Sequence, residues 1–311
     1  MSFAIVFPGQ GSQSLGMLAE LAADWPRVQQ TFAAASEALG YDLWHLVQDG
    51  PDAALNQTDK TQPAMLAAGV ATWRVWQAAG GATPAYLAGH SLGEYSALVA
   101  AGAIEFPAAV RLVERRGRLM QAAVPQGEGA MAAILGLDDE QVVEVCNQAA
   151  QGEVVQAVNF NAPGQVVVAG GKAAVERAVD VAKAAGAKRA VILPVSVPSH
   201  CSLMQGAAEE LTESLKQIHI QPPEIPVIHN VDVASHSNVE AIRDVLARQL
   251  YSPVRWVETV QALANAGVDT LVESGPGKVL AGLNKRINRD MTALPVFDAK
   301  TLAAALEAHK A

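Results

Sequence analysis

Short apolar runs alternate with longer amphipathic stretches along the chain, and turn residues separate most of them. Residues 3–7 (FAIVF) end at a Pro-Gly pair and predict a buried strand. Residues 63–80 open with Pro63 and close at a glycine pair, which predicts a helix. A second buried strand is predicted over 85–91, and residues 92–103 show the apolar spacing of a helix.

The middle of the chain has a different pattern, in which two helical segments each lie between strand-like runs. We predict strands over 130–137, 153–160, 164–170 and 189–197, and helices over 139–150 and 173–187. The resulting order, β-α-β-β-α-β, is that of the split, ferredoxin-like unit. We therefore expect a small ferredoxin-like domain over residues 127–198, inserted into a larger domain formed by 1–126 and 199–311.

The larger domain resumes with a predicted helix over 203–218. Strands are predicted over 225–232, 269–274 and 294–297, separated by helical runs. Strands that alternate with helices imply a mostly parallel sheet covered on both faces. The expected fold class is α/β: an α/β-hydrolase-like large domain with a mostly parallel sheet, and an inserted ferredoxin-like small domain.

Composition narrows the class of protein. The 311 residues are 50% hydrophobic and 17% charged, which permits a substantial core. No apolar run reaches the roughly 18 residues of a membrane span, and the first residues lack a basic segment, so we expect no membrane anchor, no signal peptide and a cytoplasmic location. A net charge of −9 disfavours nucleic acid as a partner. Cys146 and Cys201 form no CxxC pair, so we expect free core thiols and no metal site.

Residues 89–93 carry the pattern Gly-X-Ser-X-Gly. The pattern alone is weak, but here it joins a predicted strand to a predicted helix, which is the setting of a nucleophile elbow. The helix N-terminus would favour negative charge forming beside Ser91. The alternative is a turn serine that caps the following helix.

A serine nucleophile needs a base. His200 is the leading candidate because it lies between the strand that closes the small domain and the helix that reopens the large one, and active sites collect at such junctions. His90 adjoins Ser91, but sequence neighbours on a turn usually point apart. The remaining histidines have no evident catalytic setting: His45, His219, His229, His236 and His309.

One arginine differs from its neighbours on the helix predicted over 108–124. Three others fall on one solvated arc: Arg111, Arg115 and Arg118. Arg116 lies on the opposite arc among apolar residues, where a guanidinium is costly unless an anion meets it. Two interpretations stay open, an internal ion pair with a protein carboxylate and a fork for the carboxylate of a substrate.

Several motifs together resemble one family. They are FPGQGSQ, TQPAMLA, GHSLGEYSALVAAGA, RRGRLMQ, NFNAPGQVV, PVSVPSHCSLM, NVDV, RQLYSPVRW and ESGPGKVL. From end to end the chain resembles the malonyl-CoA:acyl carrier protein transacylases, the acyltransferases of bacterial fatty-acid synthesis.

The resemblance implies a ping-pong transfer through a malonyl ester of Ser91. His200 would take the serine proton and return it to the leaving thiolate, and Arg116 would bind the free malonyl carboxylate. Asn159 and Asn161 fall in a family motif near the cleft, either behind the reacting groups or in a loop that contacts pantetheine.

The resemblance also assigns roles to the backbone. The N–H groups of Gln10 and Leu92 would form the oxyanion hole. The carbonyl of Gln249 would orient the histidine in place of an aspartate, and Asp232 is the alternative orienting residue.

The implied partners are malonyl-CoA as substrate and acyl carrier protein, with no cofactor and with a monomer as the working expectation. Acyl carrier proteins are acidic, so docking needs a local basic surface. We select five residues for it: Lys188, Arg189, Lys285, Arg286 and Arg289. An ordinary solvated face is the alternative for these residues. For the whole chain, the alternatives are a serine esterase or thioesterase and a non-catalytic docking subunit.

Overall fold

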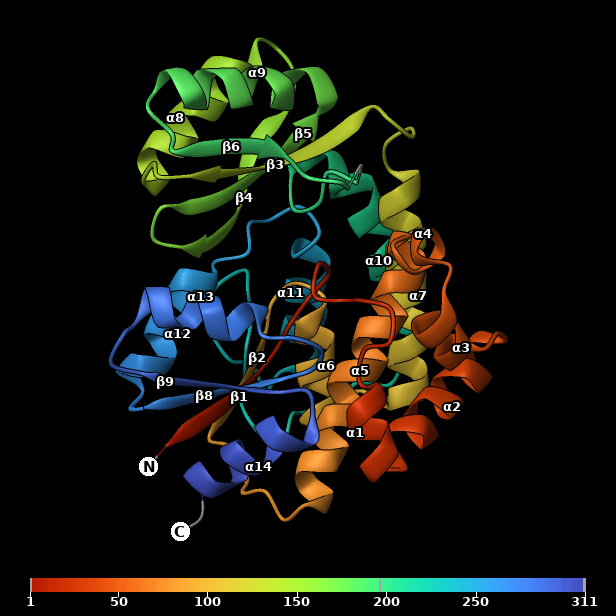
Figure 1. The fold of residues 1–311 in the computed structure, drawn as a ribbon. Helices are drawn as coiled ribbons and strands as arrows, with labels where there is room; N and C mark the ends of the chain where they lie inside the picture. Colours follow the sequence, from red (N-terminus) through yellow and green to blue (C-terminus); the bar gives the residue numbers. More distant parts are fainter. Residues whose placement is uncertain (1, 196, 310–311) are drawn as a thin grey trace.

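The computed structural model describes residues 2–195 and 197–309, and Figure 1 shows its two sheets, one in each part of the molecule. The larger sheet has the order β7-β2-β1-β8-β9, and its neighbouring strands run parallel. Its strands are β1 (Phe3–Phe7), β2 (Tyr86–Gly89), β7 (Val227–Ile228), β8 (Thr270–Ser274) and β9 (Thr292–Val296).

Helices cover both faces of this sheet, which explains why β1 is a continuous apolar run. Phe3, Ile5 and Phe7 belong to the main hydrophobic cluster, whereas Ala4 and Val6 belong to a second cluster on the opposite face. The main cluster includes residues of α1 (Ala19–Asp24), α2 (Arg27–Leu39), α3 (Leu43–Asp49), α4 (Asp52–Leu55), α5 (Thr58–Ala78), α6 (Gly93–Ala100), α7 (Phe106–Ala122), α10 (Gln205–Gln217), α11 (Val239–Arg248) and α14 (Ala299–Ala308). The second includes residues of α12 (Trp256–Asn265) and α13 (Val279–Ile287).

The smaller sheet is antiparallel, with the order β4-β5-β3-β6. It comprises β3 (Gly129–Leu135), β4 (Val155–Ala162), β5 (Gln165–Gly171) and β6 (Arg189–Ile192), with α8 (Asp139–Ala150) and α9 (Lys172–Ala184) packed on it. The two helices lie on the face turned away from the larger sheet (Figure 1). On the other side, Val254 joins the two parts, because its backbone exchanges hydrogen bonds of 2.8 and 3.0 Å with Val158 and Phe160 of β4.

The predicted α/β class, with a mostly parallel sheet and a small second sheet, is confirmed. Several details differ. The helix predicted to open at Pro63 begins at Thr58, since the backbone N–H of Thr61 already closes a turn onto Gln57 at 2.7 Å. The strand predicted over 189–197 ends at Ile192, two residues before a proline, which has no N–H to pair. Within that range, Ser196 lies outside the described residues. Residues 8–57, for which we predicted no element, contain α1 to α4. A 3₁₀ turn (Ser202–Met204) precedes α10, where one helix was predicted over 203–218.

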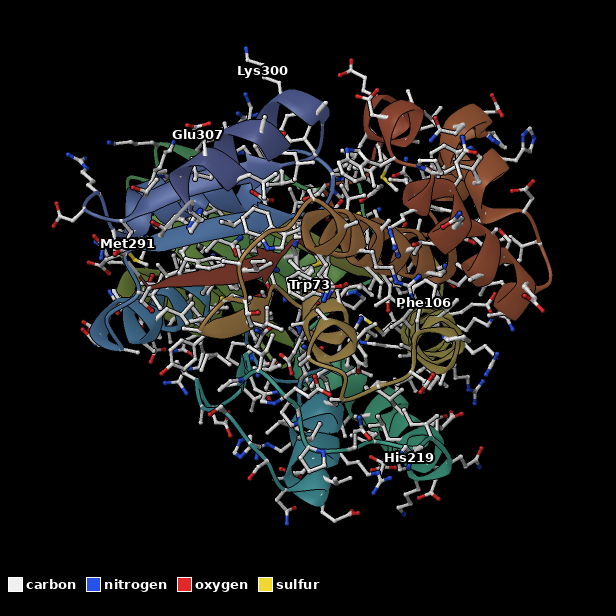
Figure 2. The ribbon with its side chains drawn as sticks, turned by 90° about the horizontal axis from the view of Figure 1, so that it is seen from below. Trp73, Phe106, His219, Met291, Lys300 and Glu307 are labelled. Carbon is white, nitrogen blue, oxygen red and sulfur yellow. The ribbon has the colours of Figure 1, made fainter. Side chains whose placement is uncertain are left out.

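The pairing of α5 with α7 positions one wall of the site. Trp73 of α5 and Phe106 of α7 are both buried, whereas Lys300 of α14 lies at the periphery of the molecule (Figure 2). At the closest approach, a Cβ on Gly117 would lie 2.7 Å from the Cα of Asp59. No helix in the described ranges is long and apolar enough to cross a membrane.

This contact predicts the effect of Gly117→Ala. The added methyl overlaps the backbone of α5, so α5 and α7 must separate, and we expect a loss of about 1–3 kcal/mol in the free energy of unfolding. Chemical denaturation measures this loss. Gly282→Ala is the control, because a Cβ there meets nothing within 4 Å in a helix. Equal stability of the two variants would contradict the close packing.

Candidate active site

Ser91 occupies a strained turn between β2 and α6. Its φ is 51°, in the left-handed region that non-glycine residues avoid. The glycines on either side are required by space: a Cβ on Gly89 would lie 1.9 Å from the carbonyl carbon of Gly93, and one on Gly93 would lie 2.0 Å from the carbonyl oxygen of Phe7. The turn therefore brings the strand, the helix and the serine together as a nucleophile elbow requires.

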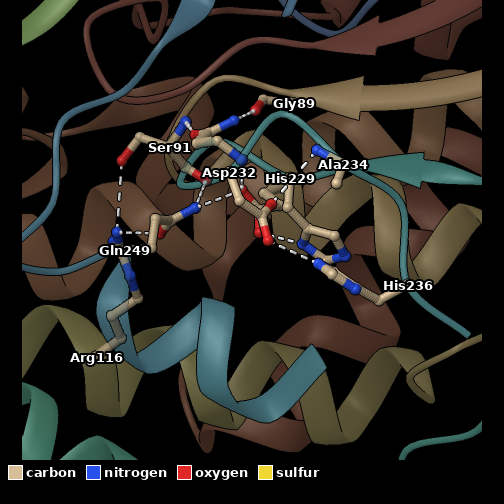
Figure 3. A network of polar contacts seen from close by, with 10 residues as sticks. Gly89, Ser91, Arg116, His229, Asp232, Ala234, His236 and Gln249 are labelled. Carbon is tan, nitrogen blue, oxygen red and sulfur yellow. Dashed lines mark hydrogen bonds and ion pairs between the residues drawn. The ribbon is translucent and has the colours of Figure 1, made fainter. Parts of the chain in front are cut away.

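The side chain of Asn230 holds this turn closed. Its Oδ1 accepts from the backbone N–H of Ser91 at 2.8 Å, and its Nδ2 donates to the carbonyl of Gly89 at 2.7 Å (Figure 3). Asn230 is fully buried, so these hydrogen bonds do not compete with water. They offset part of the strain, which costs on the order of 1–3 kcal/mol for such a residue.

His200 is placed as the base for Ser91. Its Nε2 lies 2.8 Å from Ser91 Oγ, and its Nδ1 lies 2.7 Å from the backbone carbonyl of Gln249. A carbonyl oxygen only accepts, so Nδ1 carries the proton and Nε2 is free to take the proton of the hydroxyl. The alternative hypothesis, in which Asp232 orients His200, is wrong, because the Asp232 carboxylate lies 2.8 Å from Nε2 of His236 and His200 Nδ1 binds Gln249 instead.

Burial and charge keep His200 neutral. Desolvation, followed by the nearby positive charge of Arg116, lowers the pKa of His200 to about 3. The imidazole is therefore unprotonated over the whole neutral range, and its Nε2 is open to accept a proton.

Arg116 is almost completely buried, with 1% of its surface exposed. Its Nη1 donates to Gln62 Oε1 and its Nη2 to Gln249 Oε1, both at 2.9 Å, and Nη2 lies 3.4 Å from Ser91 Oγ. The guanidinium also lies 5.4 Å from the centre of the Tyr95 ring. No ion pair to Arg116 is found in the part of the chain that the structure describes, so the internal ion pair considered from the sequence is wrong.

The loop after β1 approaches the elbow closely, since a Cβ on Gly9 would lie 2.5 Å from the carbonyl oxygen of His90. This brings the backbone of Gln10 beside the serine turn. Within residues 2–195 and 197–309, no acceptor is found for the backbone N–H of Gln10 or of Leu92. Two free donors near a nucleophile are what an oxyanion requires.

An open cavity of about 380 Å³ adjoins this loop. It is lined by Gln10, Asn56, Gln57, Thr58, Gln121, Val124, Gln126, Pro194, Val195 and Val197. Thr58 opens α5, and Val197 lies three residues before His200.

The smaller sheet adds two asparagines from β4. Asn161 Oδ1 lies 2.7 Å from His90 Nε2, which ties the histidine next to the serine away from the reacting groups. The buried Oδ1 of Asn159 has no hydrogen-bond partner among the described side chains. The structure thus brings Asn161 to the elbow and leaves Asn159 beside it on the same strand.

The two cysteines are free and buried, as predicted. Burial raises the pKa of the Cys146 thiol to about 12 and that of the Cys201 thiol to about 11, so neither is a reactive thiolate near neutral pH. Among the described residues, no group of His, Cys, Asp and Glu side chains could hold a metal ion.

The five basic candidates are exposed and cluster at one end of the smaller sheet. Arg189 pairs with Leu135, and Leu135 pairs with Gln165 on the next strand. Arg286 of α13 donates to the Gln165 side chain, which brings the end of α13 to the same edge. Lys188 and Lys285 are the chain neighbours of Arg189 and Arg286, and Arg289 follows the end of α13, three residues after Arg286.

Four residues of the site were not predicted: Gln62, Glu94, His229 and Asn230. All four are fully or almost fully buried polar side chains. Glu94 lies within an otherwise mostly apolar helical stretch, which is the signal that selected Arg116, whereas Gln62 follows a polar run at the start of α5 and has no such signal. The contacts of His229 and Asn230 join segments about 135 residues apart and leave no local pattern.

Comparison with known proteins places this geometry in context. Residues 4–299 match the model of the acyl transferase domain family. The chain is 60% identical over 305 residues to the malonyl CoA-acyl carrier protein transacylase of Escherichia coli K12, covering 98% of this chain and 99% of that protein. It is 45% identical to the protein of that name from Bacillus subtilis over 308 residues, covering 99% and 97%.

Solved structures of malonyltransferases are similar to this chain over nearly its full length. One is a malonyl-transacylase in complex with a type II PKS acyl-carrier protein, 60% identical, with a TM-score of 0.98 over 99% of this chain and 100% of that one. Another is an acyl carrier protein S-malonyltransferase from Vibrio cholerae, 62% identical, with a TM-score of 0.95 over 98% and 99%.

The lowered pKa of His200 predicts how the serine responds to pH. Because Nε2 stays unprotonated as the pH falls, labelling of Ser91 by a fluorophosphonate should change little between pH 8 and pH 5. A histidine with the ordinary pKa of about 6.5 would lose activity about thirtyfold over this range. Intact mass spectrometry gives the rate, Ser91→Ala is the blank, and circular dichroism verifies folding at each pH. A thirtyfold loss in folded protein would contradict the assignment.

Proposed function

The chain belongs to the acyl transferase family, and on this premise we propose that it transfers a malonyl group from malonyl-CoA to the phosphopantetheine thiol of acyl carrier protein. One observation carries the proposal beyond the family. The charge of Arg116, buried and without an internal ion pair, lies 3.4 Å from the hydroxyl of Ser91. An acyl group with a free carboxylate fits both positions at once.

In the first half-reaction, Ser91 Oγ attacks the thioester carbonyl while its proton moves to His200 Nε2. The developing oxyanion accepts hydrogen bonds from the backbone N–H groups of Gln10 and Leu92, each able to contribute on the order of 3 kcal/mol. The carbon–sulfur bond then breaks, the CoA sulfur takes the proton from His200, and a malonyl ester of Ser91 remains.

The second half-reaction reverses these steps with a different thiol. The pantetheine thiol gives its proton to His200 Nε2, and its sulfur attacks the ester carbonyl. The carbon–oxygen bond to Ser91 breaks, and Oγ recovers the proton. Each half exchanges one activated acyl bond for another, so every group that the chemistry needs comes from the chain and the two thiols, and the proposal includes no cofactor.

Arg116 would select the acyl group. Its two amide partners are neutral, so its planar fork can meet a carboxylate without first breaking an ion pair. An acetyl group leaves the buried charge unmet, which lowers its affinity for the site. The serine esterase or thioesterase considered from the sequence is not favoured, because the relatives reported above are transacylases.

We also propose the domain boundaries and the fold type of each domain. We assign residues 1–126 and 199–311 to an α/β-hydrolase-like catalytic domain and 127–198 to a ferredoxin-like domain. The β-α-β-β-α-β order and the strand order β4-β5-β3-β6 support the second assignment. We also place the reaction in the cytoplasm, and the proposed chemistry needs a single copy of the chain.

The exposed basic cluster is proposed as the docking surface for the acidic acyl carrier protein. Its support is the local excess of positive charge on a chain of net charge −9. The cluster spans the end of the smaller sheet and α13, so a carrier docked there would touch both parts of the molecule.

The proposed transfer predicts a stable acyl-enzyme. Incubation with malonyl-CoA should add one malonyl group to Ser91, detected by intact mass, and the ester should persist until a pantetheine thiol is supplied. In Arg116→Ala we expect kcat/KM for malonyl transfer to fall about a hundredfold, because a buried charge pair is lost, with a much smaller effect on acetyl transfer.

Rapid release of free malonate would indicate a hydrolase instead. Full transfer activity in Ser91→Ala would indicate a scaffold, and an equal fall for both acyl groups in Arg116→Ala would make the arginine structural.

The docking surface predicts a charge-reversal effect. Arg189→Glu should raise KM for acyl carrier protein about tenfold through like-charge repulsion, with little change in Ser91 acylation by malonyl-CoA. Lys183→Glu is the matched control, since Lys183 is an exposed cation on α9 of the same unit. Equal effects of the two reversals would show that overall charge, rather than this surface, governs docking.

A further inference from the structure

A fully buried glutamate lies directly behind the nucleophile elbow. Glu94 is in the first turn of α6, three residues after Ser91, and none of its surface is exposed. Its Oε1 lies 2.6 Å from His229 Nδ1, and its Oε2 accepts from the backbone N–H of Asn230 at 3.0 Å and from Gln249 Nε2 at 2.9 Å. None of the catalytic steps proposed above uses this carboxylate.

The partners of Glu94 are the residues that hold the reacting groups. Asn230 closes the strained turn at Ser91, as described above. Gln249 has two tasks, because its backbone carbonyl binds His200 Nδ1 and its side-chain oxygen binds Arg116 Nη2. Figure 3 shows the Gln249 side chain linked to both Arg116 and Ser91. One buried carboxylate therefore supports the serine, the base and the guanidinium together.

The chemistry of an amide explains what the carboxylate adds. An amide has an accepting end and a donating end of nearly equal size, so packing alone does not fix which end faces Arg116. Glu94 as a carboxylate only accepts hydrogen bonds, and so does the carbonyl oxygen of Ser91, which takes the same Gln249 Nε2 at 3.0 Å. Both force the amide nitrogen away from the guanidinium and its oxygen toward it.

We propose that Glu94 is a positioning residue: through the Gln249 amide it holds the Arg116 fork in place and so sets the preference for an acyl group with a free carboxylate. This inference rests on the proposed function.

The intervening amide also keeps the fork available. A carboxylate in direct contact with Arg116 would form the internal ion pair that the structure lacks, and the substrate would have to displace it. With Gln249 between them, Glu94 partly compensates the buried positive charge without occupying a donor of the guanidinium. Gln62 holds the other nitrogen through a second neutral oxygen at 2.9 Å.

A conservative variant can preserve the hydrogen bonds while removing the charge. In Glu94→Gln, the new amide oxygen can face Asn230 and Gln249, and the new amide nitrogen can face His229 Nδ1. That arrangement requires His229 to carry its proton on Nε2, which is buried without a partner in the present structure. A tautomer change is thus enough to satisfy every partner of residue 94, but it leaves the buried Nε2–H of His229 without an acceptor, so Glu94→Gln should lose some stability and keep the acyl preference.

The test is a double-mutant cycle between Glu94→Ala and Gln249→Ala, with kcat/KM measured for malonyl-CoA and for acetyl-CoA in each variant. If Glu94 acts through Gln249, Glu94→Ala alone should lower the malonyl-to-acetyl ratio about tenfold, and it should lower the ratio no further in the Gln249→Ala background. Glu94→Gln should restore the wild-type ratio.

Three results would overturn the inference. The first is a double variant whose malonyl-to-acetyl ratio falls by the product of the two single effects. The second is an equal fall of kcat/KM for both acyl groups in Glu94→Ala. The third is a malonyl-to-acetyl ratio in Glu94→Gln that is tenfold below that of the wild type. The last applies even if Glu94→Ala does not fold.

Glu273→Ala is the matched control for emptying a buried carboxylate. Glu273 is also fully buried, but it accepts from the backbone N–H groups of Leu280 and Ala281 at the start of α13, away from Arg116. Its removal should lower stability and leave the ratio unchanged. The wild-type protein distinguishes the proposed function from the role of Glu94. If malonyl-CoA leaves no malonyl ester on Ser91, the proposed function is rejected. If the ester forms but the double-mutant cycle shows no coupling between Glu94 and Gln249, only the role of Glu94 is rejected.

Discussion

A guanidinium keeps its charge at any physiological pH, and burying one without a counter-ion costs several kcal/mol. Arg116 is buried in this way, held by the side-chain oxygens of two glutamines rather than by a carboxylate. The arrangement satisfies part of its hydrogen-bonding capacity and leaves its charge to be met by something from outside. The need for a well-ordered surrounding network and the proposed substrate preference follow from that one buried cation, which also adds to the effect of burial in lowering the pKa of His200.

The fold makes this arrangement possible by bringing distant segments to one point. β1 contributes the loop that carries Gln10, β2 and α6 contribute the elbow, and α5 and α7 supply the two sides of the guanidinium pocket. The segment after α11 supplies Gln249, which is bound at both its backbone and its side chain. Each contact is short, so a shift of any one element would be transmitted to the serine or the base.

Local sequence patterns predicted several of these elements and site residues. The strand 3–7, the helix 139–150 and the buried side of the arginine-rich helix are set by side-chain periodicity, and the structure reproduces them. Residues 8–57 were harder, because α1, α3 and α4 have only four to seven residues each and are too short to show a clear period, whereas α2 has a helical pattern that we did not use. At the site, the serine turn and Arg116 have local signals. The contacts that join Glu94 to His229 and Asn230 have none, since they form only when segments far apart in the chain meet.

The most direct measurement is a crystal structure of the malonyl-enzyme, prepared from the unmodified protein with excess malonyl-CoA and without acyl carrier protein, so that no second thiol removes the acyl group. The account predicts an ester on Ser91 Oγ whose free carboxylate lies with both oxygens within hydrogen-bond distance of the Arg116 guanidinium. A malonyl group that instead points its carboxylate toward solvent or another side chain, with Arg116 bound only to its two glutamines, would contradict it.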